Sequence, residues 1–239
     1  MSELLPDFLR GLVSVFMNMF LMLALVQPKY KKRITYLTMF GVVAINFLVA
    51  LFCYLGGNLT LLSKVNMIFF IVQCFAIKPL FRDTIMQWLF SYITVLNVGF
   101  ISVVLSFVIS RHLPRPEYAN VAVRFVLLSL VLYLFWFVIR PVYRQVVEHW
   151  NVFFYAAILI WINFYYYILN TNDIVKMLSE QTPQLLLLVA LSIAVYVTVF
   201  HSLDVLSKEY HLREENLKIQ SRQELLNISI AAMEQRLHL

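Results

Sequence analysis

The chain has 239 residues, of which 62% are hydrophobic and only 13% are charged, and its formal net charge is +6 at pH 7. Soluble domains contain about 25% charged residues, so this composition excludes a soluble globular enzyme. The 20 Phe and 13 Tyr residues exclude a disordered chain, the 2 Cys residues exclude a disulfide-stabilised scaffold, and a membrane protein with several spans remains.

Seven apolar segments, each about as long as a membrane-spanning helix, follow one another along the chain. They are Phe8–Val26, Ile34–Leu55, Leu59–Ile77, Thr84–Ile109, Ala119–Ile139, Val152–Leu169 and Leu185–His201. None shows the alternation of a β-barrel strand, so we expect an all-α, polytopic membrane helical bundle of seven spans. The segments between them are short and polar, so consecutive helices should be antiparallel neighbours. Six spans result if the third segment, which contains Lys64 and Asn66, does not cross the membrane.

Lys and Arg are unevenly distributed between the loops. The first, third and fifth loops contain eight: Lys29, Lys31, Lys32, Arg33, Lys78, Arg82, Arg140 and Arg144. The N-terminus and the even-numbered loops contain four, and Lys64 is a borderline fifth. Because cytoplasmic loops are enriched in Lys and Arg, this bias predicts an N-terminus outside the cell and a cytoplasmic C-terminus.

The composition changes at Ser207, after which 33 residues contain five Lys or Arg, five Asp or Glu, and neither Gly nor Pro. We therefore divide the chain into a transmembrane sensor domain, 1–206, and a cytoplasmic signalling helix, 207–239. Apolar residues at a seven-residue spacing, with others four positions later, form a stripe that we call the heptad stripe. Its members are Val205, Leu212, Ile219, Leu226, Ile230, Met233 and Leu237.

A seven-residue repeat predicts left-handed pairing with another helix, and the simplest partner is the same helix of a second copy. Asn216 and Gln223 interrupt the stripe, which would weaken the pairing while fixing its register. The alternative is an amphipathic helix that lies on the inner leaflet. The balanced charges of the segment disfavour that alternative, since membrane-surface helices are usually basic.

Two segments of the tail, residues 210–220 and 230–237, carry a resemblance. The sequences Tyr-His-Leu-Arg-Glu-Glu-Asn-Leu-Lys-Ile-Gln and Ile-Ala-Ala-Met-Glu-Gln-Arg-Leu resemble the linker of bacterial GHKL-type sensor histidine kinases, in particular the accessory-gene-regulator type of peptide quorum-sensing receptor. The resemblance implies a bacterial cell-membrane sensor, a coiled linker, and a kinase with an ATP-binding domain. The Arg-His-Asp box of that family does not occur before Leu239, so the catalytic domains are expected beyond this residue and the enzyme assignment stays open.

The sequence contains no Gly-rich phosphate-binding loop, and none of its 5 His residues pairs at a spacing of three or four. We therefore expect no catalytic residue, no metal site and no cofactor within this chain. Nucleic acid is likewise not an expected partner.

Polar residues inside a span are costly in lipid and should face the bundle interior. The outer halves of the third, fifth and sixth spans supply our candidate ligand-binding residues: Lys64, Asn66, Arg124, Asn163 and Tyr166. No acidic residue lies at matching depth in a neighbouring span, so Lys64 and Arg124 either extend to the outer interface or await an anionic or carbonyl-rich ligand. The aromatic run Trp161–Tyr167 forms either an interfacial belt or, where its rings face inward, the wall of a pocket.

Together these features predict a membrane sensor, the input region of a two-component signalling histidine kinase. It would bind an extracellular peptide or another small amphipathic ligand and relay the signal through a C-terminal coiled coil. Its other expected partners are membrane lipid and, as a homodimer, a second copy of the chain. The alternative is a small membrane transporter or a substrate-binding membrane subunit of one. Transporters usually have internal repeats and helices broken near the midplane, and this sequence offers no convincing case of either.

Overall fold

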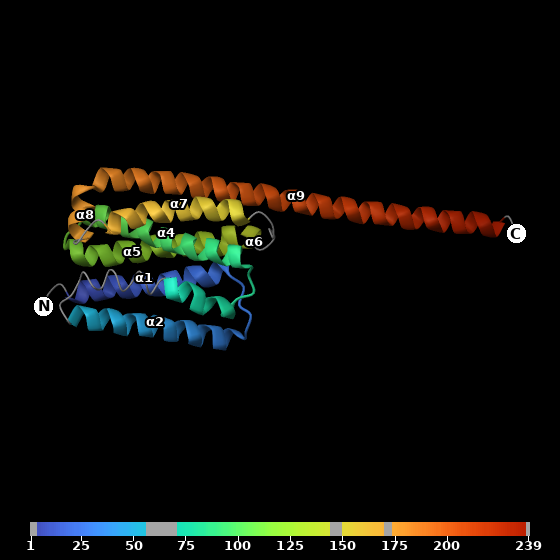
Figure 1. The fold of residues 1–239 in the computed structure, drawn as a ribbon. Helices are drawn as coiled ribbons and strands as arrows, with labels where there is room; N and C mark the ends of the chain where they lie inside the picture. The colour runs from blue at the N-terminus through green and yellow to red at the C-terminus, as the bar shows by residue number, and fades with distance from the viewer. Residues whose placement is uncertain (1–3, 56–70, 144–149, 170–173, 238–239) are drawn as a thin grey trace.

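The computed structural model describes residues 4–55, 71–143, 150–169 and 174–237. Its helices lie side by side in a bundle, from which one helix extends far beyond the others (Figure 1). The elements are α1 (Leu4–Leu25), α2 (Lys32–Leu55), η1 (Lys78–Leu80), α4 (Ile85–Ser110), α5 (Pro116–Leu134), η2 (Phe135–Ile139), α6 (Arg140–Tyr143), α7 (Trp150–Leu169), α8 (Ile174–Glu180) and α9 (Thr182–Leu237). No strand occurs in the described ranges, which confirms the predicted all-α class.

Five helical segments within the described residues are long and apolar enough to cross a membrane. They are Leu5–Leu25, Lys32–Val49, Ile85–Ser110, Pro116–Ile139 and Thr182–Ile228. Two shorter apolar helices, Ile71–Leu80 and Phe153–Tyr167, fall in the third and sixth predicted spans. These helices are compatible with a membrane protein, as the composition predicts. Most of the third predicted span, Leu59–Ile77, lies outside the described residues.

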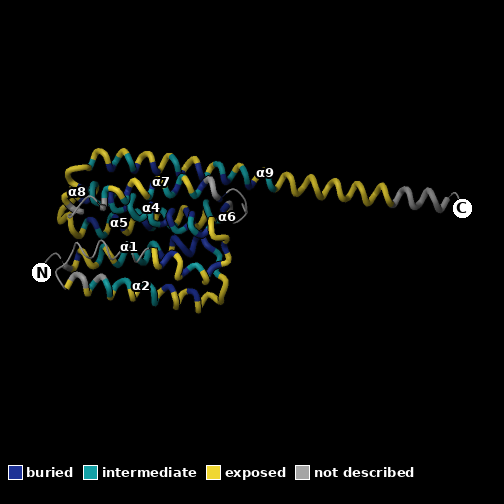
Figure 2. Tube along the Cα trace, viewed as in Figure 1, coloured by how far each residue is buried: buried dark blue, intermediate teal, exposed yellow. Residues whose placement is uncertain are grey.

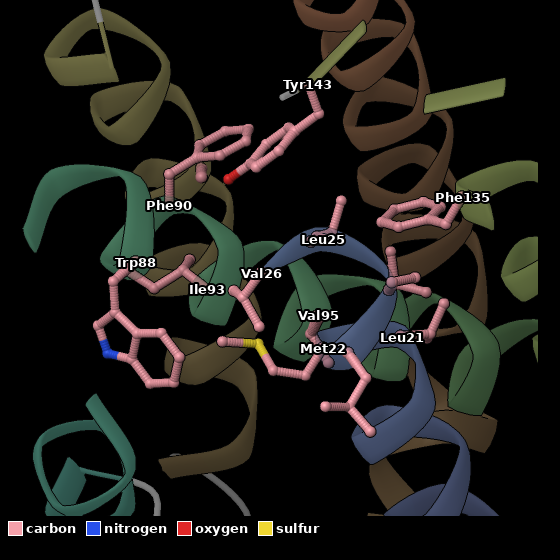
Figure 3. Close-up of a cluster of buried hydrophobic side chains, with 14 of the residues drawn as sticks. Leu21, Met22, Leu25, Val26, Trp88, Phe90, Ile93, Val95, Phe135 and Tyr143 are labelled. Carbon is pink, nitrogen blue, oxygen red and sulfur yellow. The ribbon is translucent and has the colours of Figure 1, made fainter. Parts of the chain in front are cut away.

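The bundle has two ends, and a buried cluster lies toward each of them. The start of α1, the end of α4 and the start of α5 lie at one end, which we call the N-terminal end (Figure 1). The opposite end, from which α9 emerges, is the tail end. There the end of α1 from Leu21 to Leu25, and Val26 after it, are buried against α4 residues and against Phe135 and Tyr143 (Figure 3). A second buried cluster, between α4, α7, α8 and α9, lies nearer the N-terminal end.

Helix α4 occupies the middle of the bundle and packs against α1, α5, α7 and α9. At the tail end it is tied to the preceding segment, where the indole Nε1 of Trp88 donates a hydrogen bond to the carbonyl oxygen of Cys74 at 2.9 Å. The loops before α2 and before α4 also pair. The Lys29 amide donates to the Leu80 carbonyl at 2.8 Å, and the Arg82 amide donates to the Gln27 carbonyl at 3.0 Å. The tail end is therefore closed by backbone pairing as well as by apolar packing.

The fifth predicted span extends beyond its predicted end at Ile139. We expected Arg140 to Trp150 to form a loop, but the helix continues through the π-helical turn η2 into α6, which ends at Tyr143. Pro141 cannot donate a backbone hydrogen bond and its ring crowds the preceding turn. The π turn accommodates this, since the Arg140 amide reaches back five residues to Phe135. Tyr143 is fully buried and its hydroxyl lies 3.2 Å from the Gln87 carbonyl, so packing holds the extension in place.

A second difference concerns the segment from Asn170 to Pro183, which we expected to be a loop. It contains the short helix α8, and α9 begins within it at Thr182. Two apolar residues of α8, Met177 and Leu178, are buried in the second cluster. Burial of these two side chains explains why a segment with a loop-like composition folds against the bundle.

Helix α9 has 56 residues and joins the last predicted span to the predicted tail without a break. Its buried positions recur every three or four residues along one side: Leu185, Val189, Ser192, Tyr196, Val199, Leu203 and Ser207. Every described side chain from 211 to 228 is exposed, and burial ends where α9 leaves the bundle (Figure 2). The predicted boundary at 206/207 thus falls inside one continuous helix.

The heptad stripe lies on the exposed side of α9 as far as the described side chains extend. Val205, Leu212, Ile219 and Leu226 are all at least 50% exposed. Ile230, Met233 and Leu237 belong to the helix, but their side chains lie outside the described set. The chain by itself leaves the stripe uncovered, and its pairing stays a prediction.

Candidate functional site

Three helices bring polar side chains together at the N-terminal end of the bundle. We call this group the polar seam, and its members are Arg10 and Ser14 of α1, Ser106 and Ser110 of α4, and Asn120 and Arg124 of α5. On each helix the two residues are four positions apart, which places them on one face. Since α1, α4 and α5 pack against one another, these three faces meet.

Arg124 lies at the centre of the polar seam and is only 9% exposed. Its Nε donates to the Ser106 hydroxyl at 3.3 Å, and its Nη1 donates to the Ser14 hydroxyl at 3.1 Å. The two serine hydroxyls in turn donate hydrogen bonds to backbone carbonyls, Ser14 to that of Arg10 and Ser106 to that of Val103. All the hydrogen-bond partners of this guanidinium among the described residues are therefore neutral hydroxyls.

Asn120, one helical turn nearer the N-terminal end, is 2% exposed. Its amide nitrogen donates to the Ser110 hydroxyl at 3.3 Å. Its Oδ1 is buried and has no hydrogen-bond partner within the described residues. Buried amide oxygens are normally paired, so this oxygen can accept a further hydrogen bond.

The charges of the seam do not cancel. Arg10 forms an ion pair with Asp7, which is half-exposed at the start of α1. Arg124 has no carboxylate within ion-pair distance in the described part of the chain. The Nε of Arg10 is also buried without a partner among these residues. Two cations and one carboxylate leave one positive charge that is not neutralised.

Deeper in the bundle, polar groups link helices to one another. The amide nitrogen of Asn97 on α4 donates to the Ala157 carbonyl of α7 at 2.9 Å and to the Tyr196 hydroxyl of α9 at 2.7 Å. On the other side of α4, Gly99 lies beside Asn18 of α1, and an added Cβ would be 3.2 Å from the Asn18 amide nitrogen. These contacts connect the helices that carry the seam with α9.

The structure separates the described members of the predicted ligand site. Arg124 is buried in the polar seam, whereas Asn163 and Tyr166 lie on the exposed side of α7. The Asn163 side chain donates to the Leu159 carbonyl of its own helix at 2.8 Å, and the Tyr166 ring meets that of Tyr167 edge to face. Lys64 and Asn66 lie outside the described residues. Of the three candidates that the structure describes, Arg124 alone is buried.

The rings of the aromatic run of α7 differ in how far they are buried. Phe164 is buried and stacks on Phe100 of α4, with ring centroids 5.8 Å apart. Trp161 stacks on Tyr165 of the same helix at 5.0 Å, and both are half-buried. Phe164 thus packs in the core, Trp161 and Tyr167 are partly buried against the two buried clusters, and Tyr166 is exposed.

Our sequence analysis missed five members of the seam: Arg10, Ser14, Ser106, Ser110 and Asn120. A signal for them exists, because Arg10, Ser14 and Asn18 are four residues apart, as are Ser102, Ser106 and Ser110. Such spacing marks a polar face on an apolar helix.

The described residues contain no group of three His, Cys, Asp or Glu side chains that could hold a metal ion. Comparison of the chain with protein-family models, curated proteins and solved structures gives no match. The function must therefore be argued from the geometry of the seam and of α9.

Proposed function

We propose that this chain is the membrane input region of a signalling receptor, and that it resembles the sensor of a GHKL-type histidine kinase. An extracellular amphipathic ligand, such as a peptide, binds at the N-terminal end of the bundle, and α9 passes the change to the tail. The observation that carries this proposal is the continuity of α9, which is one helix from the N-terminal end to Leu237.

The proposed topology has seven spans, with the N-terminus outside a bacterial cell membrane and the C-terminus in the cytoplasm. The exposed positive residues of the first loop, together with Arg82 and Arg140, lie at the tail end of the bundle. Arg111 and Arg115 lie at the N-terminal end. The larger group of positive residues therefore shares one end with the emerging tail, as the positive-inside rule requires of a cytoplasmic face.

A physical route connects the polar seam to α9. Ser106 and Ser110 belong to α4, which also carries Asn97, and Asn97 is hydrogen-bonded to Tyr196 of α9. A ligand that moves α4 relative to α1 and α5 acts on this contact. To relay the signal, the helices must have two arrangements whose free energies differ by only a few kcal/mol, and the ligand must bind one arrangement more tightly than the other.

The output end of the receptor is proposed to be a homodimer. The heptad stripe faces away from the bundle and is exposed along the described tail. A solitary polar helix of this length is marginally stable in water, and pairing with the same helix of a second copy covers the stripe.

A small transporter is the rival function, and the closed tail end disfavours it. Cargo would have to leave through the end where Leu21–Val26 are buried and the two loops are paired. A long exposed cytoplasmic helix also has no evident part in moving cargo.

The test is a chimera in which the dimerisation and catalytic domains of a GHKL-type kinase follow Leu239. A seven-residue helical insertion after Ser207 keeps the heptad phase, whereas a two-residue insertion turns the tail by about 200°. We expect the first insertion to preserve autophosphorylation and the second to change it severalfold. Equal activity of the two insertions would remove the relay through α9.

A further inference from the structure

We propose that the polar seam binds the end of an acylated amino acid or peptide, with its carboxylate on Arg124 and its neighbouring amide N–H on Asn120. This inference rests on the proposed function and names the chemistry that its ligand site recognises. Both halves of the group follow from unmet bonding capacity in the seam.

The carboxylate follows from the charge of Arg124. A guanidinium remains protonated in proteins, and a buried cation without a counter-ion is costly in an apolar environment. Two of its five N–H donors reach serine hydroxyls, and no acceptor for the others occurs among the described residues. A carboxylate is the group that a guanidinium fork binds in bidentate fashion.

The amide follows from Asn120. Its buried Oδ1 accepts nothing in the described structure, so the seam offers an acceptor one helical turn from the cation. A simple anion, such as a fatty acid or a lipid phosphate, cannot donate to this oxygen. A group that joins a carboxylate to an amide N–H fills both positions, and the end of a peptide chain is such a group.

The Asp7–Arg10 ion pair is more exposed than Arg124. Arg124 is 9% exposed, Arg10 is 22% exposed and Asp7 is 48% exposed. The Asp7 carboxylate is paired with Arg10, so it offsets part of the positive charge that would attract an anionic ligand. Removing its charge should therefore strengthen binding of an anionic ligand.

The probe is N-decanoylglycine, which carries the acyl chain, the amide N–H and the carboxylate. Its controls are N-decanoylglycinamide, which lacks the negative charge, and decanoyloxyacetate, in which an ester replaces the amide. Binding is measured by calorimetry to the purified full chain in phosphatidylcholine nanodiscs. We expect the probe to bind at least about tenfold more tightly than either control, since a charged or buried hydrogen bond is lost in each.

Variants then assign the contacts. Arg124→Gln should weaken binding of the probe at least about tenfold, and Asn120→Ala should abolish its advantage over the ester. Asp7→Asn should tighten binding, and Arg115→Gln, which removes an exposed charge at the same end, should change nothing. If Arg124→Gln fails to fold, Arg10→Gln, at a more exposed position, serves in its place and should also weaken binding.

Equal binding of the probe and its neutral amide, or unchanged binding after Arg124→Gln, would overturn the inference. So would Arg124-dependent displacement of the probe by phosphatidylglycerol in the nanodiscs, which would assign the seam to an anionic lipid. The proposed function is tested separately, by measuring how far cysteines at position 219 crosslink with and without the probe. Binding without a change in crosslinking would leave the site standing and remove the relay.

Discussion

Arg124 is held by hydroxyl groups of α1 and α4, and no carboxylate among the described residues pairs with its charge. Ser14 and Ser106 satisfy part of the guanidinium but supply no negative charge. Structural arginines in such places usually have a carboxylate partner. At the scale of single residues this is the strongest indication of a binding role in the described structure.

Asn97 joins two helices to α4, since its side-chain nitrogen donates to both α7 and α9, while its Oδ1 is buried without a partner among the described residues. We expect Asn97→Leu to destabilise the fold by about 1–2 kcal/mol, because the Tyr196 hydroxyl loses a buried partner. The measurement is reversible unfolding in mixed micelles. Asn163→Leu is the matched control, as Asn163 is exposed and bonded to its own helix. Equal effects of the two changes would show that Asn97 does not link α4 to α9.

Individual residues were the least predictable level. Arg124 was identifiable because a charge within a span is rare, but the sequence left open whether it extends to the outer interface, and the structure has it buried. The serine partners of Arg124 could not be identified from the sequence, because serine is common in membrane helices and only the packing shows which serines face the guanidinium. The sequence places Asn163 and Tyr166 at about the same depth in the membrane as Arg124. Depth does not determine which face of a helix a residue occupies, and that face decides whether the residue is buried.

At the scale of elements, α9 shows how one helix can serve two environments. Inside the bundle, its buried face packs against α4 and α7. From the end of the bundle onward, ion pairs support it, with Asp204–Lys208, Glu209–Arg213 and Glu214–Lys218 at 2.6, 2.7 and 2.6 Å. In each pair the acid precedes the base by four residues, which is the favourable order in a helix.

Crosslinking between copies tests the heptad stripe of this helix. With Cys53 and Cys74 replaced by alanine, a cysteine at position 219 or 226 should crosslink readily, because both positions lie on the stripe. Leu217 is the matched control, since it is 65% exposed against 53% for Ile219 but lies on the opposite face of the helix. Cysteines at 218 and 222 should also react less. Equal crosslinking at 217 and 219 would mean that the seven-residue spacing does not pair two copies.

Elements were predictable where a long apolar run fills a helix, as in α1 and α4. The ends of elements were not. Pro141 suggested a loop, but a π turn and the burial of Tyr143 carry the helix past it. In the same way, α8 forms because two apolar side chains find a buried cluster, which composition alone does not reveal.

At the scale of the whole molecule, the two ends of the bundle have different chemistry. The N-terminal end contains the polar seam, and the tail end is sealed by apolar packing and paired loops. Composition predicts helices in a membrane, since about 20 apolar residues are needed for each crossing. Composition does not show this difference between the two ends of the bundle, because the difference arises from how three separate helices pack.

We propose that α9 connects an extracellular polar seam with a cytoplasmic helix. Cysteine accessibility in intact cells tests it most directly, in a background where Cys53 and Cys74 are alanine. Single cysteines replace Arg115 at the N-terminal end, Lys31 at the tail end and Arg222 on the tail, all of which are exposed. With an impermeant maleimide we expect labelling at 115 and protection at 31 and 222 until the cells are opened. Labelling of 222 in intact cells, or protection of 115, would contradict the account.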